Sequence, residues 1–112
     1  MKKLLCAIFV LVAASVYSQD ITVLQINAEW NKKNNYDLSN ITGATVKFSY
    51  LKDQPNDVQN SIMAVPVIVI MDQTGRVRMQ YVADISLQIK ATNLEIQNTV
   101  DRLKRSRRES TN

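Results

Sequence analysis

Short blocks of apolar residues along this chain predict strands, and the alternation inside each block indicates how the strand is buried. Residues 21–27 are mostly β-branched and apolar with partial alternation, which predicts a buried strand. Residues 44–51 alternate more fully, and this second predicted strand follows the turn residue Gly43. Its apolar residues on one face are Val46, Phe48 and Tyr50.

Two further strands are predicted between residues 67 and 83. Residues 67–71 are five consecutive apolar residues, as in a strand that is covered on both faces. A turn signal at residues 72–75 follows, and residues 76–83 alternate as the hairpin partner. The apolar residues of that partner are expected on one face and are Val77, Met79 and Tyr81.

Two segments have the apolar spacing of helices. In residues 52–63, Asp53 or Gln54 suits the cap and Pro55 the first turn. The expected buried stripe of this helix is Val58, Ile62 and Met63. Residues 87–105 form the second predicted helix, with Ser86 as its cap. Its apolar stripe is Leu87, Ile89, Leu94, Ile96, Val100 and Leu103.

The predicted element order is β-α-β-α-β-β-α. The first two strands should be parallel through a crossover, and the last two should form an antiparallel hairpin. The expected fold class is therefore α/β, with a four-stranded mixed sheet flanked by helices on both faces. Whether residues 31–43 form the first helix or a loop stays open, because this segment has few apolar residues.

The N-terminus has the pattern of an export signal. Lys2 and Lys3 precede a mostly apolar stretch of about a dozen residues, which is short for a membrane span. We expect residues 1–18 to be a signal peptide and residues 19–105 to be one domain, exported to a bacterial periplasm or cell envelope. The alternative is an uncleaved N-terminal anchor.

The net charge of +4 comes from the ends of the chain. Residues 19–101 carry seven Lys or Arg against nine Asp or Glu. We expect residues 106–112 to be a disordered tail, since they have no apolar residue. The basic residues at this end are Arg102, Lys104, Arg105, Arg107 and Arg108.

Four local features together resemble the thioredoxin-like superfamily, over about residues 21–105. Residues 23–30 look like the strand that leads into the active-site turn of that family, and Asn31-Lys32-Lys33-Asn34 occupies the Cys-x-x-Cys position. Residues 64–66 look like the loop with a cis proline, and residues 72–77 look like the hairpin turn. The resemblance implies a minimal thioredoxin-like fold. The extra N-terminal strand and helix of the family are missing.

The resemblance also implies a binding groove without redox chemistry. Both cysteine positions are Asn, and Asn cannot supply the thiolate that disulfide exchange needs. A protein or peptide ligand could still add a strand beside Val65, the residue before the proline. The expected groove residues are Trp30, Asn31, Asn34, Val65 and Pro66. As alternatives, the two Asn are simple caps and Trp30 packs on the sheet edge.

Other chemistry has little support in the sequence. The chain has no His, and its single cysteine, Cys6, lies in the predicted leader, so no nucleophile pair or common zinc site is available. We therefore expect no catalytic residue, no metal and no cofactor. An alternative function is a structural or assembly role through the C-terminal helix and the basic tail, which could bind an anionic surface. The tail lacks the aromatics of nucleic-acid readers.

Overall fold

The computed structural model describes residues 20–110, and side chains up to residue 106. The predicted signal peptide, residues 1–18, lies outside this range. The four strands are β1 (Ile21–Asn27), β2 (Ala44–Tyr50), β3 (Val67–Met71) and β4 (Val77–Val82). The helical elements are the 3-10 helices η1 (Glu29–Asn34) and η2 (Leu51–Asp53) and the α-helices α2 (Asn56–Ser61) and α3 (Asn93–Ser110).

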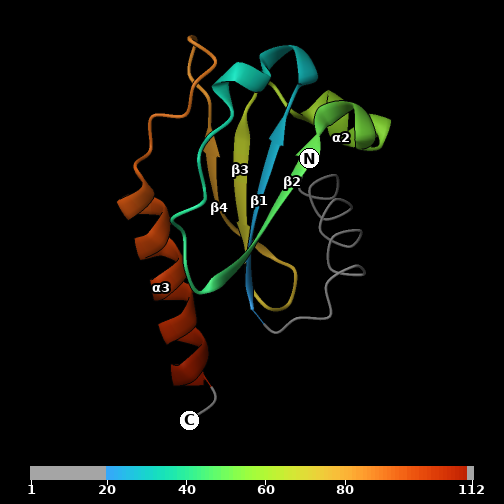
Figure 1. Ribbon diagram of the computed structural model, residues 1–112. Coiled ribbons are helices and arrows are strands. Elements are labelled where there is room, and N and C mark those ends of the chain that lie inside the picture. The colour runs from blue at the N-terminus through green and yellow to red at the C-terminus, as the bar shows by residue number, and fades with distance from the viewer. Residues whose placement is uncertain (1–19, 111–112) are drawn as a thin grey trace.

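The four strands form one mixed sheet in the order β2-β1-β3-β4. β1 pairs with β2 in parallel and with β3 antiparallel, and β3 and β4 are antiparallel. The predicted four-stranded mixed sheet, its parallel first pair and its antiparallel hairpin are confirmed. The chain is thus a small α/β fold in which the C-terminal end of β1, the start of β3 and the end of β4 lie at the same end of the sheet (Figure 1).

Apolar side chains cover both faces of the two central strands. On one face, Ile96, Val100 and Leu103 of α3 join one core cluster with residues of β1 and β3. On the other face, Val58 of α2 joins the second cluster, which includes Leu24 from β1. This two-sided burial explains why β1 and β3 read as almost continuous apolar runs.

A β-bulge in the hairpin corrects one predicted face. Ile70 pairs with Met79 but Met71 pairs with Val77, so Arg78 is the extra residue in β4. The extra residue reverses the alternation. Met79 therefore packs on the α3 side of the sheet, whereas Val77 packs on the α2 side. The prediction that Val77 shares a face with Met79 and Tyr81 was wrong.

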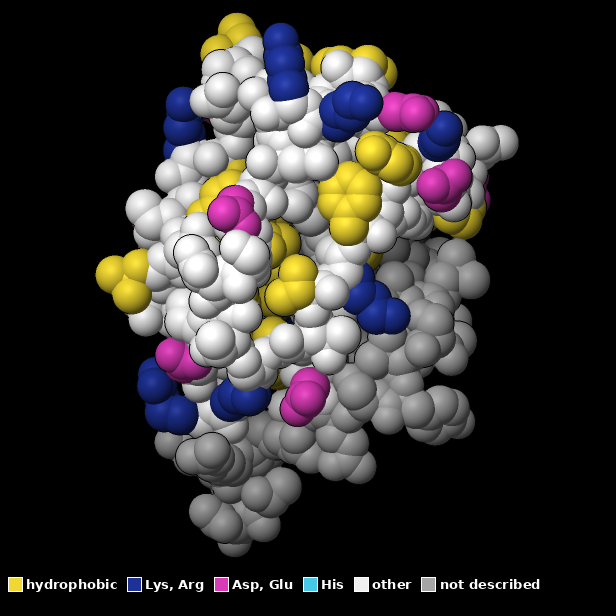
Figure 2. All heavy atoms as spheres, viewed as in Figure 1, with side chains coloured by type: hydrophobic (Ala, Val, Ile, Leu, Met, Phe, Trp, Pro, Cys, Tyr) yellow, Lys and Arg dark blue, Asp and Glu magenta, His cyan; other side chains and the backbone are white. Residues whose placement is uncertain are grey.

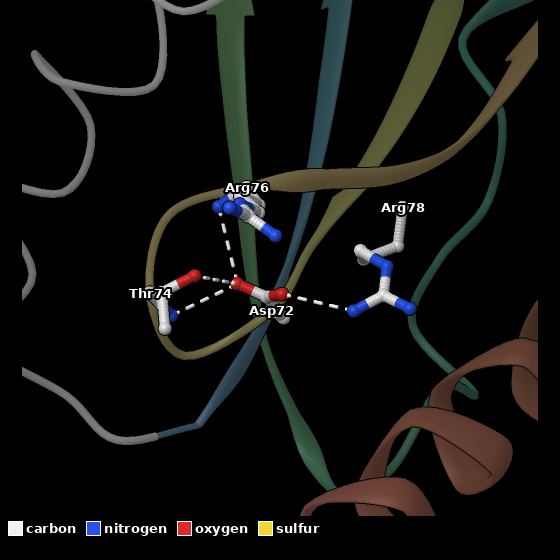
Figure 3. A network of polar contacts seen from close by, with 4 residues as sticks. All are labelled: Asp72, Thr74, Arg76 and Arg78. Carbon is white, nitrogen blue, oxygen red and sulfur yellow. Dashed lines mark hydrogen bonds and ion pairs between the residues drawn. The ribbon is translucent and has the colours of Figure 1, made fainter.

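The hairpin turn is organised by the Asp72 carboxylate (Figure 3). Its Oδ1 accepts hydrogen bonds from the backbone N–H groups of Thr74 (2.9 Å) and Arg76 (3.1 Å), and its Oδ2 lies 3.2 Å from the Arg78 guanidinium. Gly75 has a φ of 84°, which a residue with a Cβ rarely adopts. The predicted turn at residues 72–75 is confirmed.

The C-terminal helix begins later and ends later than predicted. A turn that Asp84 organises ends at Leu87, which has a φ of 63°. α3 starts only at Asn93, where the Thr92 hydroxyl accepts a hydrogen bond from the Glu95 N–H at 3.1 Å. Ser86 is therefore not the cap.

The ends of the predicted α3 stripe also need correction. Leu87 and Ile89 lie in the loop before the helix, and Leu94 is exposed. α3 continues to Ser110, so residues 106–110, which were expected to be disordered, are helical. The reason is that a helix already held by its buried apolar stripe can extend through polar residues with good helix propensity.

The two remaining helical segments are shorter than the sequence pattern indicated. Residues 52–63 divide into η2 and the six-residue α2, and Pro55 lies just before α2. Val58 is buried as predicted, but Met63 lies beyond the helix and is exposed. Residues 29–34 form η1, and the chain then runs to β2 without further helix. Residues 31–43, for which helix and loop both stayed open, are therefore mainly a loop.

Candidate functional site

Three loops meet at one end of the sheet, at the top of Figure 1. The first is η1, which follows β1. The second, residues 62–66, leads into β3, and its Val65–Pro66 peptide bond is cis, as the resemblance implied. The third, residues 84–88, follows β4. We call these three segments together the three-loop end.

The Asn31 side chain joins the three loops. It is 1% exposed. Its Nδ2 lies 3.3 Å from the carbonyl oxygens of both Val65 and Leu87 and can donate to each. The same group lies 3.3 Å from the Asn27 Oδ1 at the end of β1. A buried amide that bonds to two distant segments fixes their positions relative to η1.

Other asparagines complete this polar cluster. Asn27 is fully buried and donates to the Asn31 carbonyl oxygen at 3.1 Å and to the Asn35 side chain. Asn34 donates from its Nδ2 to the Asn31 Oδ1 at 2.8 Å, and its own Oδ1 accepts from Gln88 at 3.3 Å. The cluster thus satisfies the buried amides without a bound ligand.

Leu87 has an unfavourable backbone conformation at the point where it bonds to Asn31. Its φ of 63° costs about 1–2 kcal/mol for a residue with a Cβ. The turn is supported by the hydrogen bond from the Leu87 N–H to the Asp84 carbonyl oxygen, at 2.9 Å. The conformation directs the Leu87 carbonyl oxygen to the Asn31 amide. Asn31 therefore also helps to hold this strained residue in place.

Each of the three loops carries one very exposed apolar side chain. Trp30 is 70% exposed, Met63 is 95% exposed and Ile85 is 102% exposed. Along the sequence, Trp30 directly precedes Asn31. Met63 and Ile85 lie two residues before Val65 and Leu87, whose carbonyl oxygens accept from Asn31. Large apolar side chains exposed on loops that meet at one end of a sheet are candidates for an interaction surface.

The structure divides the five predicted groove residues into two groups. Asn31, Val65 and Pro66 are buried, so their side chains form the base of the three-loop end. Trp30 is exposed and Asn34 is half-buried. Hydrogen bonds bring Asn31 together with both Val65 and Asn34. The alternative that Trp30 packs on the sheet edge is wrong, since its side chain faces solvent.

The sequence interpretation missed Met63, Ile85 and Asn27. Met63 was assigned to a buried helical stripe, and Ile85 was not considered. The one signal for Asn27 is an amide at the end of an otherwise apolar strand, where a buried polar side chain needs partners. For Met63 and Ile85, the signal is an isolated large apolar residue between a strand and a helix pattern.

Two ion pairs neutralise the acidic residues of the three-loop end. Lys52 Nζ lies 2.7 Å from Glu29 Oε2, and this hydrogen bond lowers the pKa of Glu29 and raises that of Lys52. Lys90 Nζ lies 3.9 Å from Asp84 Oδ2. The hydrogen bond from Ser86 lowers the pKa of Asp84 further. Both carboxylates are thus ionised at neutral pH.

Lys32 and Lys33 differ from these paired lysines. Both are exposed on η1, and neither ammonium group forms a salt bridge or a hydrogen bond within the part of the chain that the structure describes, although the charge of Lys32 helps to lower the pKa of Glu29. Figure 2 shows basic side chains and hydrophobic ones gathered at the upper end of the molecule. The three-loop end therefore combines exposed apolar side chains with two lysines that form no salt bridge.

Other candidate sites are weaker. Among residues 20–110, no group of three or more acidic, Cys or His side chains is placed to hold a metal ion. A surface hollow of about 450 Å³ lies between β2 and the preceding loop, with Leu38, Ile41, Val46 and Phe48 in its wall. It does not include the residues of the three-loop end.

No helix in the described range has the length and apolar character to cross a membrane.

Sequence comparisons identify no relative from which a function could be transferred, so the functional conclusion depends on the geometry of the structure. No protein-family model matches this chain, and no curated protein is significantly similar to it.

Proposed function

We propose that this chain is a non-catalytic, thioredoxin-like module that binds a protein or peptide at its three-loop end. The observation that carries the proposal is the grouping of Trp30, Met63 and Ile85 on three loops that one buried amide holds together. The strand order and strand directions support the thioredoxin-like part, since the resemblance implies a parallel first pair and an antiparallel hairpin. We further propose that the module acts after export to a bacterial periplasm or envelope.

The backbone of Val65 supports strand addition by the ligand. Val65 precedes the cis bond to Pro66, and its carbonyl oxygen accepts a hydrogen bond from the Asn31 side chain. The backbone of this loop is therefore held at the three-loop end, directly before β3. A ligand segment laid along this loop would add a strand there.

Redox catalysis is not part of the proposal. The positions that carry the two thiols in catalytic relatives hold Asn31 and Asn34, and the Asn31 side chain is committed to hydrogen bonds inside the protein. In a reduced-insulin turnover assay with dithiothreitol, we expect the rate of the background reaction. A rate clearly above background would contradict the proposal.

Binding can be tested with a displayed library of random twelve-residue peptides. Wild-type protein should enrich peptides, and Trp30→Ala should weaken binding of the best peptide at least tenfold, because a Trp at an interface hot spot contributes about 2 kcal/mol. Leu94→Ala is the matched control, since Leu94 is 68% exposed but lies on α3. Failure to enrich any peptide, or equal loss in both variants, would overturn the proposed function.

A further inference from the structure

We infer that the ligand of the three-loop end is an acidic segment, with carboxylates next to apolar side chains. This inference rests on the proposed function and specifies the chemistry of the partner. It starts from Lys32 and Lys33, the exposed lysines of η1 whose ammonium groups form no salt bridge in the described part of the chain.

The position of the two lysines connects them to the apolar contact area. They follow Trp30 and Asn31 directly in η1, so they share the short helix that presents the Trp30 side chain. A segment that covers Trp30 must therefore pass close to two ammonium groups. Complementary charge in such a segment would raise the association rate and favour one class of partner over others.

The neighbouring carboxylates compensate this charge only in part, although Lys32 also acts on Glu29. Glu29 is paired with Lys52, and Asp84 lies beside Lys90. Asp53 and Asp57 belong to η2 and α2 at the β2 side of this end. Figure 2 shows acidic, basic and hydrophobic side chains close together in the upper part of the molecule. The positive charge is thus local to η1, although residues 19–101 as a whole carry more acidic than basic residues.

This asymmetry separates an acidic peptide from a general anion site. A nucleic acid or a lipid surface needs a broad basic face, because its affinity depends on many simultaneous phosphate contacts. Here two exposed lysines share η1 with Trp30, at the end of the sheet that also exposes Met63 and Ile85. This arrangement matches a short polypeptide with a few carboxylates and an apolar centre.

The test uses the full chain and the random twelve-residue library described above. Wild-type protein should enrich Asp and Glu next to apolar residues. The double variant K32E/K33E should lose that preference and enrich Lys and Arg instead, with at least tenfold weaker binding of the best wild-type peptide. The matched control is R102E/R105E, which makes the same charge change at two exposed positions of α3 and should select the same peptides as wild type.

The outcomes separate this inference from the proposed function. Enriched peptides that are apolar without acidic residues, or the same peptides on wild type and K32E/K33E, would overturn the inference and leave peptide binding intact. Loss of the acidic preference in R102E/R105E but not in K32E/K33E would move the basic contact to α3 and also overturn the inference. Absence of enrichment on wild type would overturn both proposals.

Discussion

At the scale of single residues, Asn31 has the largest structural effect for its size. A polar side chain with 1% exposure must satisfy its donors, and Asn31 does so by bonding to carbonyls 34 and 56 residues away along the chain. The sequence placed Asn31 at a turn but could not show where its amide points, because both acceptors come from distant loops. Its role is to position the loops that carry the exposed apolar side chains.

Asn31→Asp tests this role with an isosteric change. The new carboxylate would face the carbonyl oxygens of Val65 and Leu87 and could not donate to them. We expect the free energy of unfolding at pH 7, measured with urea, to fall by roughly 3 kcal/mol, as for an uncompensated buried charge. Asn35→Asp is the control, since Asn35 is exposed and its Oδ1 accepts from Asn27, which a carboxylate can also do, so the change should cost less than about 1 kcal/mol. Equal losses would contradict the positioning role.

The ionisation of Asp72 should make the stability of the protein depend on pH in the acidic range. Burial alone would raise its pKa, but hydrogen bonds from Thr74, Arg76 and Arg78 outweigh burial and lower the pKa below its usual 3.8. A lowered folded-state pKa stabilises the fold above the unfolded value, and this stabilisation disappears as the pH falls through the folded value.

We therefore expect Asp72→Ala to lower the free energy of unfolding by about 1–3 kcal/mol at pH 7, since four donor groups on three residues lose a charged acceptor. The difference between variant and wild type should shrink below about pH 3. Urea unfolding at both pH values measures this, and Asp53→Ala is the control because Asp53 is exposed in η2. A difference that stays constant with pH would contradict the account.

At the scale of elements, the sequence pattern predicted the positions of the four strands but not the β-bulge in the hairpin. β1 and β3 have the predicted bounds, because runs of β-branched residues flanked by polar ones are unambiguous. The bulge at Arg78 was not predictable, since one inserted residue leaves the alternation of the letters intact while it reverses the faces. Of the site, Trp30 and Val65 were found through the resemblance. The exposure of Met63 and Ile85 depends on where α2 ends and where α3 begins, which the sequence pattern placed wrongly.

The start of α3 was recoverable from local chemistry. Thr92-Asn93-Leu94-Glu95 has the spacing of a capping box, a stronger start signal than the isolated Ser86. Thr92→Ala should lower the free energy of unfolding by about 1 kcal/mol, through loss of the bond to the Glu95 N–H. Thr92→Ser keeps the hydroxyl and should remain near wild type in the same urea experiment. Unchanged stability of Thr92→Ala would mean that this cap contributes nothing.

At the scale of the whole molecule, the two ends of the sheet have different characters. The three-loop end brings together residues that are far apart in the sequence and exposes apolar side chains on them. The opposite end holds the Asp72 turn, whose polar groups bond to one another. Because, within residues 20–110, only the three-loop end exposes large apolar side chains on loops from distant parts of the chain, we assign binding to that end. The alternative is that the protein contacts its partner through α3 and its basic residues.

The most direct test is an NMR titration of isotope-labelled full-length protein with the best peptide from the random library. The account predicts chemical-shift changes at the Trp30 indole N–H and at the backbone amides of Met63, Val65 and Ile85. The α3 amides beyond Asn93 should stay unchanged. Shift changes confined to α3 and its basic residues, with Trp30 unaffected, would contradict the central claim that the three-loop end is the binding surface.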